Sequence, residues 1–439
     1  MSLLSDFSVP SLGVARVTSP MKLSDAPGDF VASYVTDDEL IRYDITCKPG
    51  EAQVCERKDL LELAGPREKI YFDPAKVHAA IVTCGGLCPG LNDVIHAIVM
   101  TLWYHYGVRR ISGIRFGYRG FLPDYSFPTI ELTPRVVAEI PMLGGTMLGS
   151  SRGAGDRVEE IVDALERMGI QMLFTIGGDG TQRGSLQIAE EIKKRGLKIA
   201  LVGIPKTIDN DLSFIERSFG FETAVARAVD AVSNAHVEAH DSINGVGLVK
   251  VMGRQSGFIA AHTALASNDV NYVLIPEVPF DLDGPRGLLV DLKQRLQTRN
   301  HAVILVAEGT GQELLKVSAE RDASGNQKLG DIGAFLNKKI VEYFKEQKTE
   351  INVKYIDPSY MIRSAPANPS DSIYCSRLGA NAVHAAMTGK TQVLIGQINN
   401  QLVHIPIAMA TSRQNTVNPE SALWRDVLES TGQPMVMKN

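Results

Sequence analysis

The chain has 439 residues, of which 44% are hydrophobic and 22% are charged, ordinary values for a globular protein with a sizeable core. This composition excludes a disordered, collagen-like or disulfide-framework protein, and the length allows roughly two to four domains of ~100–200 residues. The 45 basic and 50 acidic side chains leave a formal charge of -5, so we expect no nucleic-acid partner.

The cysteine content and the termini bear on where the protein works. Five cysteines are few for this length and odd in number, which is typical of a reducing compartment. No window approaches the ~20 consecutive apolar residues of a membrane-spanning helix. The N-terminus lacks a cationic region followed by an apolar one, so a secretory signal is not expected. We therefore predict a cytoplasmic protein without a membrane partner.

The first 75 residues differ from the rest of the chain. They carry scattered proline and aspartate with little periodicity, which predicts an N-terminal extension that partly packs on the main body. Regular patterning starts with a strand over Val77–Thr83. This strand enters the glycine-rich turn Cys84–Gly90, and a helical stretch follows as far as Tyr106.

The same unit of strand, glycine turn and helix then recurs. The expected elements are a helix over Arg157–Met168, a strand over Met172–Ile176, the turn Gly177–Gly180, a helix through Lys194, a strand over Ile199–Ile204, a helix over Thr223–His236, and strands over Val246–Val251 and Val303–Ala307. This alternation is typical of α/β proteins, in which helices cover parallel sheets. Ligands of such sheets bind beyond the carboxyl ends of the strands, where the polar turns of this chain fall.

Two glycine turns are candidates for binding phosphate. Glycines at Gly85 and Gly86, between a strand and a helix, let backbone N–H groups approach phosphate oxygens, although a tight turn without a ligand is the alternative. Asp179 in the turn Gly177–Thr181 can hold Mg²⁺, or it can simply cap the following helix. No Gly-Lys-Ser/Thr follows the first turn, so it is not a Walker A loop. We interpret Cys84 and Cys88 as structural, because no second Cys/His pair lies nearby.

The turn after the Ile199–Ile204 strand carries two carboxylates, Asp209 and Asp211, together with Lys206 and Thr207. Phosphoryl transfer to an alcohol requires a base near the hydroxyl and positive charge on the transferring group. A solvated loop is the alternative for such a turn in isolation.

Further polar residues follow turns or strand ends. Arg152, Arg254 and Arg363 are suited to bidentate binding of phosphate, or else form surface ion pairs. Glu308 ends an apolar run, where it either accepts hydrogen bonds from sugar hydroxyls or is a buried, paired carboxylate.

With these segments, the sequence resembles the phosphofructokinase family, in particular its longer ATP-dependent branch of plants and protists. The resemblance runs from about Val77 to about Pro406. It rests on the motifs Thr-Cys-Gly-Gly-Leu-Cys-Pro-Gly-Leu-Asn, Leu-Gly-Gly-Thr-Met-Leu-Gly-Ser-Ser-Arg, Gly-Gly-Asp-Gly-Thr, Pro-Lys-Thr-Ile-Asp-Asn-Asp, Lys-Val-Met-Gly-Arg, Ala-Glu-Gly and Tyr-Met-Ile-Arg. Gly-Gly-Asp-Gly-Thr is weak, because NAD kinases and diacylglycerol kinases carry something similar. Pro-Lys-Thr-Ile-Asp-Asn-Asp followed by Met-Gly-Arg is specific.

The resemblance implies an α/β fold of two Rossmann-like parallel-sheet domains with an active-site cleft between them, plus the N-terminal extension. The expected boundaries are 1–75 for the extension, 76–220 and 362–412 for a larger nucleotide-side domain, and 221–361 and 413–439 for a smaller sugar-phosphate-side domain. It also implies a homodimer or homotetramer, because sites in the family borrow side chains across subunits, and an allosteric enzyme of glycolysis.

The resemblance also implies roles for individual residues. On the donor side, Gly85, Gly180, Thr181 and Gly184 would approach the nucleotide of ATP, Asp179 would hold Mg²⁺, and Arg152 would bridge the donor phosphates and the sugar. Asp209 is similar to the catalytic base that takes the proton from the 1-hydroxyl of fructose 6-phosphate, with Lys206, Thr207 and Asp211 beside it. The residues expected to hold fructose 6-phosphate are Met252, Gly253, Arg254, Glu308, Tyr360, Arg363 and, serving a neighbouring subunit, Lys354.

Two positions depart from the bacterial pattern. Gly245 stands where bacterial enzymes place an inter-subunit arginine, so that contact is replaced or lost. Lys206 replaces a bacterial glycine, a feature shared with pyrophosphate-dependent members. The donor prediction therefore rests on Gly180, where pyrophosphate users typically carry an aspartate that opposes the α-phosphate of a nucleotide. ATP is favoured and pyrophosphate is the alternative.

Two further hypotheses remain open. A kinase such as an NAD kinase would share only the Gly-Gly-Asp-Gly-Thr turn, and the rest of the motif series argues against it. A catalytically silent regulatory or scaffolding subunit would have no need of Asp179, Asp209 and Arg152, all of which are intact.

Overall fold

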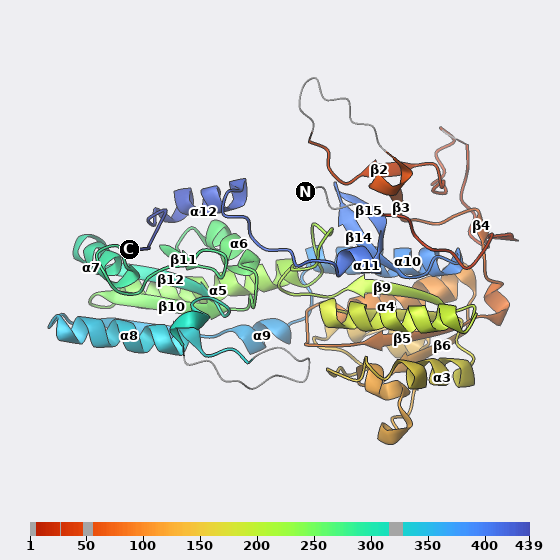
Figure 1. Ribbon diagram of the computed structural model, residues 1–439, viewed down its shortest axis with the longest axis horizontal. Coiled ribbons are helices and arrows are strands. Elements are labelled where there is room, and N and C mark those ends of the chain that lie inside the picture. Colours follow the sequence, from red (N-terminus) through yellow and green to blue (C-terminus); the bar gives the residue numbers. More distant parts are fainter. Residues whose placement is uncertain (1–5, 27, 47–55, 316–327) are drawn as a thin grey trace. The chain divides into compact units, whose positions relative to one another are not determined.

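The computed structural model describes residues 6–26, 28–46, 56–315 and 328–439. The chain forms two compact units, each described separately below (Figure 1). Unit 1 comprises Met1–Thr207, Leu212–Gly220 and Ala365–Gln414, and unit 2 comprises Ile208–Asp211, Phe221–Ser364 and Asn415–Asn439. The turn Ile208–Asp211 therefore groups with unit 2, although we assigned it from sequence to the larger domain. Backbone atoms of this turn are hydrogen-bonded by Ser256 and Asn415 of unit 2.

Unit 1 is built on a nine-stranded sheet (Figure 1). Its strand order is β2 (Leu40–Arg42), β3 (Leu60–Leu63), β15 (Gln401–Pro406), β14 (Val393–Ile398), β9 (Ala200–Pro205), β8 (Met172–Gly177), β5 (His78–Thr83), β6 (Arg110–Ile114) and β7 (Ile130–Glu131). The strands from β14 to β6 pair in parallel, whereas β15, β3, β2 and β7 are added by antiparallel pairing. The sheet is therefore mixed, while the sequence predicted only parallel pairing.

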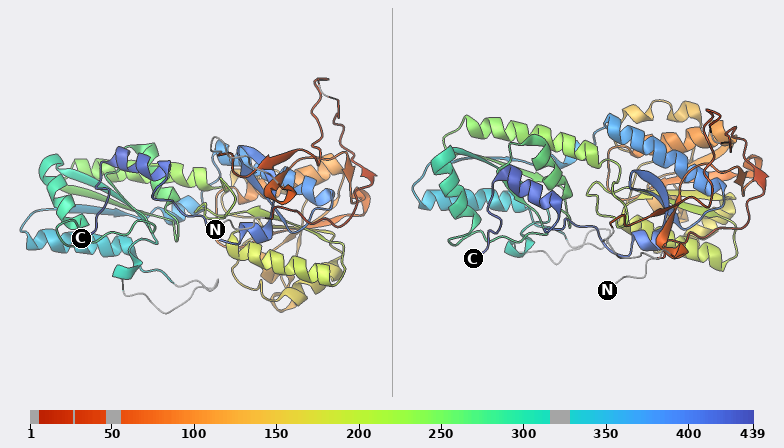
Figure 2. Two further views of the ribbon diagram at one scale, coloured as in Figure 1. Left: turned by 45° about the horizontal axis from the view of Figure 1, so that its top comes forward. Right: turned by 90° about the horizontal axis from the view of Figure 1, so that it is seen from above.

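Helices cover both faces of this sheet. On one face α1 (Leu91–Met100) packs along α10 (Pro369–Met387), and on the other α3 (Val158–Met168) packs along α4 (Asp179–Lys194), as Figures 1 and 2 show. The short helix α11 (Ile407–Ala410) contacts α4. A π-helical segment, Thr101–Tyr106, continues α1 to the expected end, where Gly107 has a φ of 77°.

The central strands form the core of unit 1. Every residue of β5, β8 and β9 is buried, as expected for parallel strands covered on both faces. The hairpin from β14 to β15 was not predicted. Its two turn residues, Asn399 and Asn400, have φ values of 49° and 60°, a conformation that asparagine tolerates in two-residue hairpin turns.

The N-terminal extension supplies strands to unit 1. A small antiparallel pair joins β1 (Val17–Thr18) to β4 (Lys69–Ile70), and β2 and β3 extend the main sheet through β15. The carboxylate of Glu62 on β3 is buried against His404 Nδ1 at 3.3 Å and Lys390 Nζ at 2.8 Å. This ion pair fixes the extension to the edge of the sheet.

Unit 2 contains a parallel four-stranded sheet in the order β11 (Tyr272–Leu274), β12 (His301–Ala307), β10 (Gly245–Val251) and β13 (Asn352–Ile356). Helices α5 (Phe221–His240) and α6 (Phe258–Ser267) pack together against it, and α12 (Ala422–Thr431) packs on α6. Helices α7 (Leu288–Arg299) and α8 (Ile332–Glu346) also pack against the strands (Figure 2). The short helix α9 (Ser359–Arg363) follows β13. The α/β class expected from sequence is confirmed.

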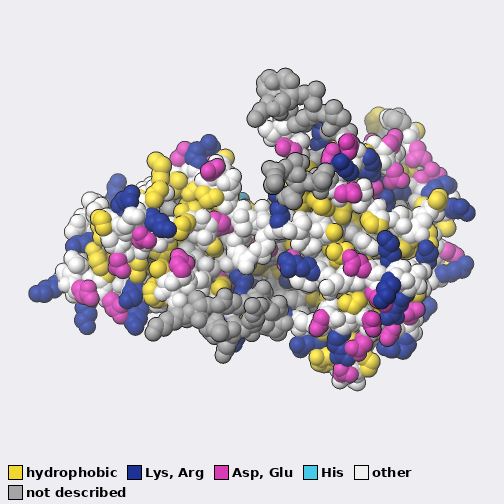
Figure 3. Space-filling view, viewed as in Figure 1, with side chains coloured by type: hydrophobic (Ala, Val, Ile, Leu, Met, Phe, Trp, Pro, Cys, Tyr) yellow, Lys and Arg dark blue, Asp and Glu magenta, His cyan; other side chains and the backbone are white. Residues whose placement is uncertain are grey.

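The surface of each unit is charged and mixed. On the face drawn in Figure 3, acidic and basic side chains are interspersed over both units. Among the helices of the described residues, none combines the length and apolar character that spanning a bilayer requires.

Candidate active site

Three of the candidate segments of unit 1 leave one edge of its sheet. The glycine turn follows β5, Asp179 follows β8, and Lys206 follows β9. These strands are parallel neighbours, with Thr83 beside Ile176 and Gly177 beside Pro205. The sheet therefore brings the glycine loop, a carboxylate and a lysine together at its carboxyl edge, the edge at which α/β proteins bind ligands.

Lys206 lies against the glycine turn. Its Nζ donates to the backbone carbonyl of Gly86 at 2.8 Å, and a Cβ on Gly85 would lie 3.3 Å from that nitrogen. Only 7% of the lysine is exposed, and its backbone N–H donates to the carbonyl of Gly177 at 3.1 Å. The site thus holds a largely desolvated ammonium group, which stabilises negative charge more strongly than a cation in water.

The segment that carries Arg152 packs on the same turn. The N–H of Gly85 donates to the carbonyl of Ser151 at 2.9 Å, and Ser150 Oγ donates to the carbonyl of Gly85 at 2.7 Å. A Cβ on Gly86 would lie 3.7 Å from Arg152 Nη2. The guanidinium and the ammonium of Lys206 therefore both border Gly86.

Asp179 begins α4, and its carboxylate pairs with Arg183 at 2.5 Å. The side chain of Asp179 is 25% exposed. Within the described ranges, no three His, Cys, Asp or Glu side chains gather closely enough to hold a metal by themselves. The single carboxylate of Asp179 suits Mg²⁺, which protein sites commonly bind through one or two carboxylates together with substrate phosphates and water.

The residues expected to approach the nucleotide differ in their surroundings. A Cβ on Gly180 would meet nothing within 4 Å, whereas one on Gly184 would lie 3.1 Å from the Tyr118 ring and 3.6 Å from Gly155 Cα. The buried Thr181 accepts a hydrogen bond from Tyr118 Oη at its carbonyl, at 2.8 Å. Gly180 therefore faces open space, while Gly184 allows close packing inside unit 1.

In unit 2 the carboxyl of Asp209 is removed from water. Its Oδ1 is buried and has no hydrogen-bond partner within the described residues. Its Oδ2 accepts the backbone N–H of Arg254 at 3.4 Å, a long contact. The backbone carbonyl of Asp209 accepts Ser256 Oγ at 2.9 Å. The position of the Asp209 side chain is thus set mainly by the hydrogen bonds that fix its backbone.

These surroundings raise the pKa of Asp209 to about 7. Loss of solvation is the largest cause, and the negative charges of Asp211 and Glu308 add to it. The hydrogen bond from Arg254 and the charge of Arg363 lower the pKa by less. A carboxyl that titrates near neutral pH is well matched to accept a proton from an alcohol during reaction.

Two turns meet at the carboxyl edge of the unit 2 sheet. The N–H of Glu308 donates to the carbonyl of Val251 at 2.9 Å, and that of Gly309 donates to the carbonyl of Gly253 at 3.0 Å. A Cβ on Gly309 would lie 1.9 Å from the carbonyl oxygen of Arg254, so no side chain fits there. Gly309 belongs to the motif Ala-Glu-Gly, but the sequence did not predict that this position requires glycine. The buried Met252 precedes the first turn.

Helix α9 carries two of the expected sugar-phosphate residues, Tyr360, which is 83% exposed, and Arg363. Its start is fixed by Asp357, whose Oδ1 accepts the N–H of Ser359 at 3.1 Å. The Nζ of Lys250, on the neighbouring β10, pairs with Asp357 Oδ2 at 3.0 Å and Asp331 Oδ1 at 3.1 Å. Lys250 belongs to the motif Lys-Val-Met-Gly-Arg, but the sequence predicted no role for it, because its partners are distant along the chain.

Lys354 does not join the cluster around Asp209 within the chain. It lies beside Gly247 in the register of β13 and β10, four residues or ~13 Å before Val251 along the strand direction. Its side chain is 42% exposed and pairs with Glu238 at 3.5 Å. A role in a neighbouring subunit stays a prediction.

The three remaining residues considered from the sequence, Thr207, Cys84 and Cys88, are buried in unit 1. Thr207 is 9% exposed, and its carbonyl accepts Ser218 Oγ. Cys84 and Cys88 are buried and unbonded to each other, and burial raises the pKa of the Cys84 thiol to about 12. Their surroundings suit structural cysteines.

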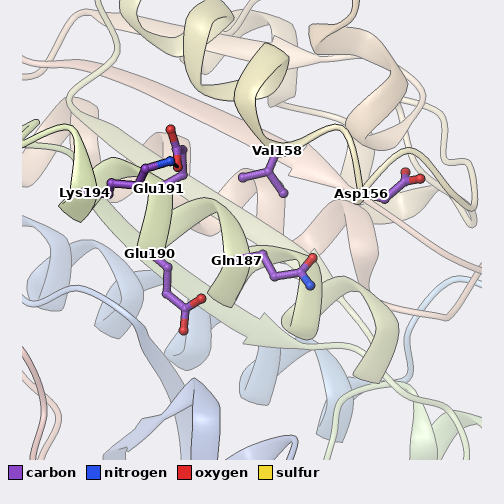
Figure 4. A pocket seen from close by; sticks show the side chains of 6 residues that line it. All are labelled: Asp156, Val158, Gln187, Glu190, Glu191 and Lys194. Carbon is purple, nitrogen blue, oxygen red and sulfur yellow. Dashed lines mark hydrogen bonds and ion pairs between the residues drawn. The ribbon is translucent and has the colours of Figure 1, made fainter.

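A separate cavity of about 430 Å³ lies between α3 and α4, away from these residues. It is lined by Asp156, Val158, Gln187, Glu190, Glu191 and Lys194 (Figure 4). Glu191 is already paired with Lys194 at 2.9 Å and Arg195 at 2.8 Å, and the side chains drawn do not converge on one point. We assign no ligand to it.

Residues 78–386 match the phosphofructokinase family. The chain belongs to this family. An ATP-dependent 6-phosphofructokinase of Borreliella burgdorferi is 57% identical over 446 residues, which cover 99% of this chain and 98% of the relative. One from Amycolatopsis methanolica is 47% identical over 98% of this chain and 95% of the relative. ATP-dependent 6-phosphofructokinase 7 of Arabidopsis thaliana is 48% identical over 95% and 85%. The family expected from the motifs is confirmed.

Solved structures agree on the fold. A pyrophosphate-dependent phosphofructokinase from Marinobacter aquaeolei has a TM-score of 0.67 at 19% identity, covering 81% of this chain and 91% of that one. A Pichia pastoris phosphofructokinase has a TM-score of 0.63 at 21% identity, covering 81% of this chain and 37% of that one. At these identities the likeness concerns the fold alone.

Proposed function

We propose that this phosphofructokinase transfers the γ-phosphoryl group of ATP to the 1-hydroxyl of fructose 6-phosphate, giving ADP and fructose 1,6-bisphosphate. The observation that carries the proposal is the Asp209 carboxyl of unit 2, whose Oδ1 is buried and whose pKa is raised to about 7 beside Arg254 and Arg363. The curated relatives named above, each described as an ATP-dependent 6-phosphofructokinase, support it over nearly the whole chain.

Unit 2 supplies the acceptor side of the reaction in this proposal. Asp209 accepts the proton of the 1-hydroxyl, whose oxygen attacks the γ-phosphorus while the bond to the ADP oxygen breaks. Arg254, Glu308 and Arg363 hold the sugar phosphate and its hydroxyls. Asp211 raises the pKa of Asp209 and so keeps it near the value at which a base is effective. Met252, Gly253 and Tyr360 complete the sugar site.

Unit 1 supplies the donor side. The backbone of Gly85 and the side chains of Arg152 and Lys206 bind phosphate oxygens, and the two cations offset charge that develops on the transferring group. Asp179 would hold Mg²⁺, which neutralises the donor phosphates when it is bound. Thr207 links the donor-side lysine to the turn that carries the base.

Gly180 supports ATP as the donor. Because the position of its missing side chain is open, a nucleotide has room there, and an aspartate would place a carboxylate in that space. Lys206 neutralises charge with either donor, but the ATP-dependent relatives argue against pyrophosphate, the alternative donor. We further propose, from the family, a cytoplasmic homodimer or homotetramer under allosteric control, in which Lys354 serves a neighbouring subunit.

Assays of the purified chain with each donor test the proposal. Fructose 1,6-bisphosphate should form with Mg²⁺ and ATP, and at a far lower rate with Mg²⁺ and pyrophosphate. Activity with pyrophosphate and none with ATP would reverse the donor assignment. Phosphorylation of NAD without phosphorylation of fructose 6-phosphate would reject the proposed reaction.

A further inference from the structure

A half-buried glutamate outside the expected site, Glu277, joins two distant backbone segments of unit 2. Glu277 follows β11, and its Oε1 accepts the N–H of Gly257 at 2.9 Å and the N–H of Val417 at 2.7 Å. Gly257 begins α6, whereas Val417 belongs to the C-terminal segment that enters unit 2 at Asn415. One oxygen therefore ties two segments that are 160 residues apart in sequence.

Each of these segments also holds one end of the turn that carries Asp209. Ser256 Oγ, next to Gly257, donates to the carbonyl of Asp209 at 2.9 Å. The N–H of Asn415 donates to the carbonyl of Asp211 at 2.8 Å. These four hydrogen bonds close a ring through Asp209, Ser256, Gly257, Glu277, Val417, Asn415 and Asp211, which we call the Asp209 ring.

The local packing keeps Glu277 in this position at a cost in free energy. A Cβ on Gly257 would lie 2.3 Å from Ile275 Cγ2 and 3.0 Å from Glu277 Oε2, so the close approach of that backbone requires glycine. Within the described residues, Oε2 is buried without a hydrogen-bond partner, and burial raises the pKa of the carboxyl. A buried polar atom without a hydrogen-bond partner destabilises the folded state.

The Asp209 side chain itself is weakly held. Its Oδ1 has no described partner, and its Oδ2 has only the 3.4 Å contact with Arg254 among its direct hydrogen bonds. The position of the carboxyl therefore depends on the backbone turn, and the turn is fixed from both ends by the ring. Glu277 is the acceptor that joins the two sides of that ring.

We propose that Glu277 is a positioning residue for phosphoryl transfer, which orients the base Asp209 by holding Gly257 and Val417. This inference rests on the proposed function, in which Asp209 takes the proton of the acceptor alcohol. Loss of the ring lets the turn move and admits water, so that the base is misplaced and its pKa falls toward the ordinary range of an aspartate. A base misplaced by about 1 Å costs up to ~100-fold in rate.

Four variants distinguish positioning from general stability. Glu277→Met keeps the volume and removes the acceptor, whereas Glu277→Gln keeps an oxygen able to accept both N–H groups. Ser256→Ala opens the ring at another bond, and it serves also if Glu277→Met does not fold. The matched control is Tyr272→Phe, which removes the 2.6 Å hydrogen bond from Tyr272 Oη to Asp291 in the strand just before Glu277, outside the ring.

For each variant, kcat, the KM for fructose 6-phosphate and the pH profile of kcat are measured with ATP, and melting is followed separately. We expect Glu277→Met and Ser256→Ala to lower kcat about 10- to 100-fold, with KM within about threefold, and to move the acidic limb of the kcat profile to lower pH. Glu277→Gln should keep kcat within about threefold and keep the acidic limb in place. Tyr272→Phe should lower the melting temperature without moving the limb.

The inference is overturned if Glu277→Met, or Ser256→Ala where Glu277→Met does not fold, keeps the wild-type kcat and acidic limb. It is equally overturned if the variants lose activity only in proportion to folded protein, as Tyr272→Phe would. Failure of the wild type itself to phosphorylate fructose 6-phosphate with ATP is a different result, which rejects the proposed function before any variant is compared.

Discussion

Replacing Asp209 by asparagine should remove activity and at the same time stabilise the protein near neutral pH. Burial raises the pKa of this carboxyl from 3.8 to about 7, a shift of roughly three units. At 1.36 kcal/mol per unit, keeping the carboxylate charged in the folded protein costs up to about 4 kcal/mol of unfolding free energy above pH 7. The asparagine side chain of the Asp209→Asn variant carries no charge, so the variant should avoid this cost.

The sign of the pH dependence follows from the two pKa values. Between pH 3.8 and about 7 the folded protein binds a proton at Asp209 that the unfolded chain has released, so wild-type stability falls as the pH rises through this window. The Asp209→Asn variant lacks this dependence. The difference in melting temperature between variant and wild type should therefore be near zero at pH 4 and several degrees in favour of the variant at pH 8.

Calorimetry at pH 4, 6 and 8, with kcat measured at pH 8, tests both parts of the prediction. We expect kcat to fall at least about a thousandfold, because asparagine cannot accept the proton. Asp211→Asn is a useful control, since it removes the negative charge that acts on Asp209 without removing the proposed base. A stability difference that stays constant across the pH range would refute the burial argument, and wild-type kcat in Asp209→Asn would refute the base.

Gly180→Asp should raise the KM for ATP at least about fivefold while leaving the KM for fructose 6-phosphate unchanged, because like charges about 4 Å apart repel by about 1–4 kcal/mol. Gly180→Ala, which fills the same open space without charge, should change the KM for ATP little. Lys250→Met removes the ion-pair partner of Asp357, before α9, and of Asp331, before α8, so the KM for fructose 6-phosphate should rise about tenfold with kcat largely kept. Lys250→Arg should be milder, and equal losses in kcat would contradict a binding role. Burial raises the pKa of Glu62, but the hydrogen bonds and charges of His404 and Lys390 together outweigh it and lower the pKa from 4.5 to about 2. Glu62→Gln should therefore cost up to about 3 kcal/mol of unfolding free energy at pH 7 and progressively less as the pH falls below 4.5, measured by denaturant unfolding.

The sequence predicted the parallel centre of unit 1 because each βαβ unit has a local sequence pattern, an apolar run followed by a glycine turn and a helix. The expected strand over Met172–Ile176 ends one residue later in the structure, at Gly177, and its glycine turn follows directly. The antiparallel strands that extend this sheet have no such local pattern. Strands β2 and β3 are three and four residues long. β3 is placed by pairing with β15, which lies far along the chain, and β2 is added to β3.

The candidate site shows the same division between local and distant information. Motifs located Asp179, Asp209 and Arg254, because glycine and acidic residues after a buried run mark a strand end. They predicted no role for Lys250, although it lies in one of them, and they did not include Glu277; the partners of both residues are brought to them only by folding. Sequence reasoning therefore found residues that offer chemistry and missed residues that hold them in place.

The raised pKa of Asp209 and the Asp209 ring are two consequences of one arrangement. A carboxyl that titrates near neutral pH has to be kept from water, and a carboxyl held directly by only one long hydrogen bond has to be positioned by its backbone. In unit 2 the backbone does this through Ser256 and Asn415, and Glu277 joins the two. A variant that restores solvent or hydrogen bonds to the Asp209 carboxyl should gain stability and lose catalysis together, because the same desolvation destabilises the folded state and tunes the base.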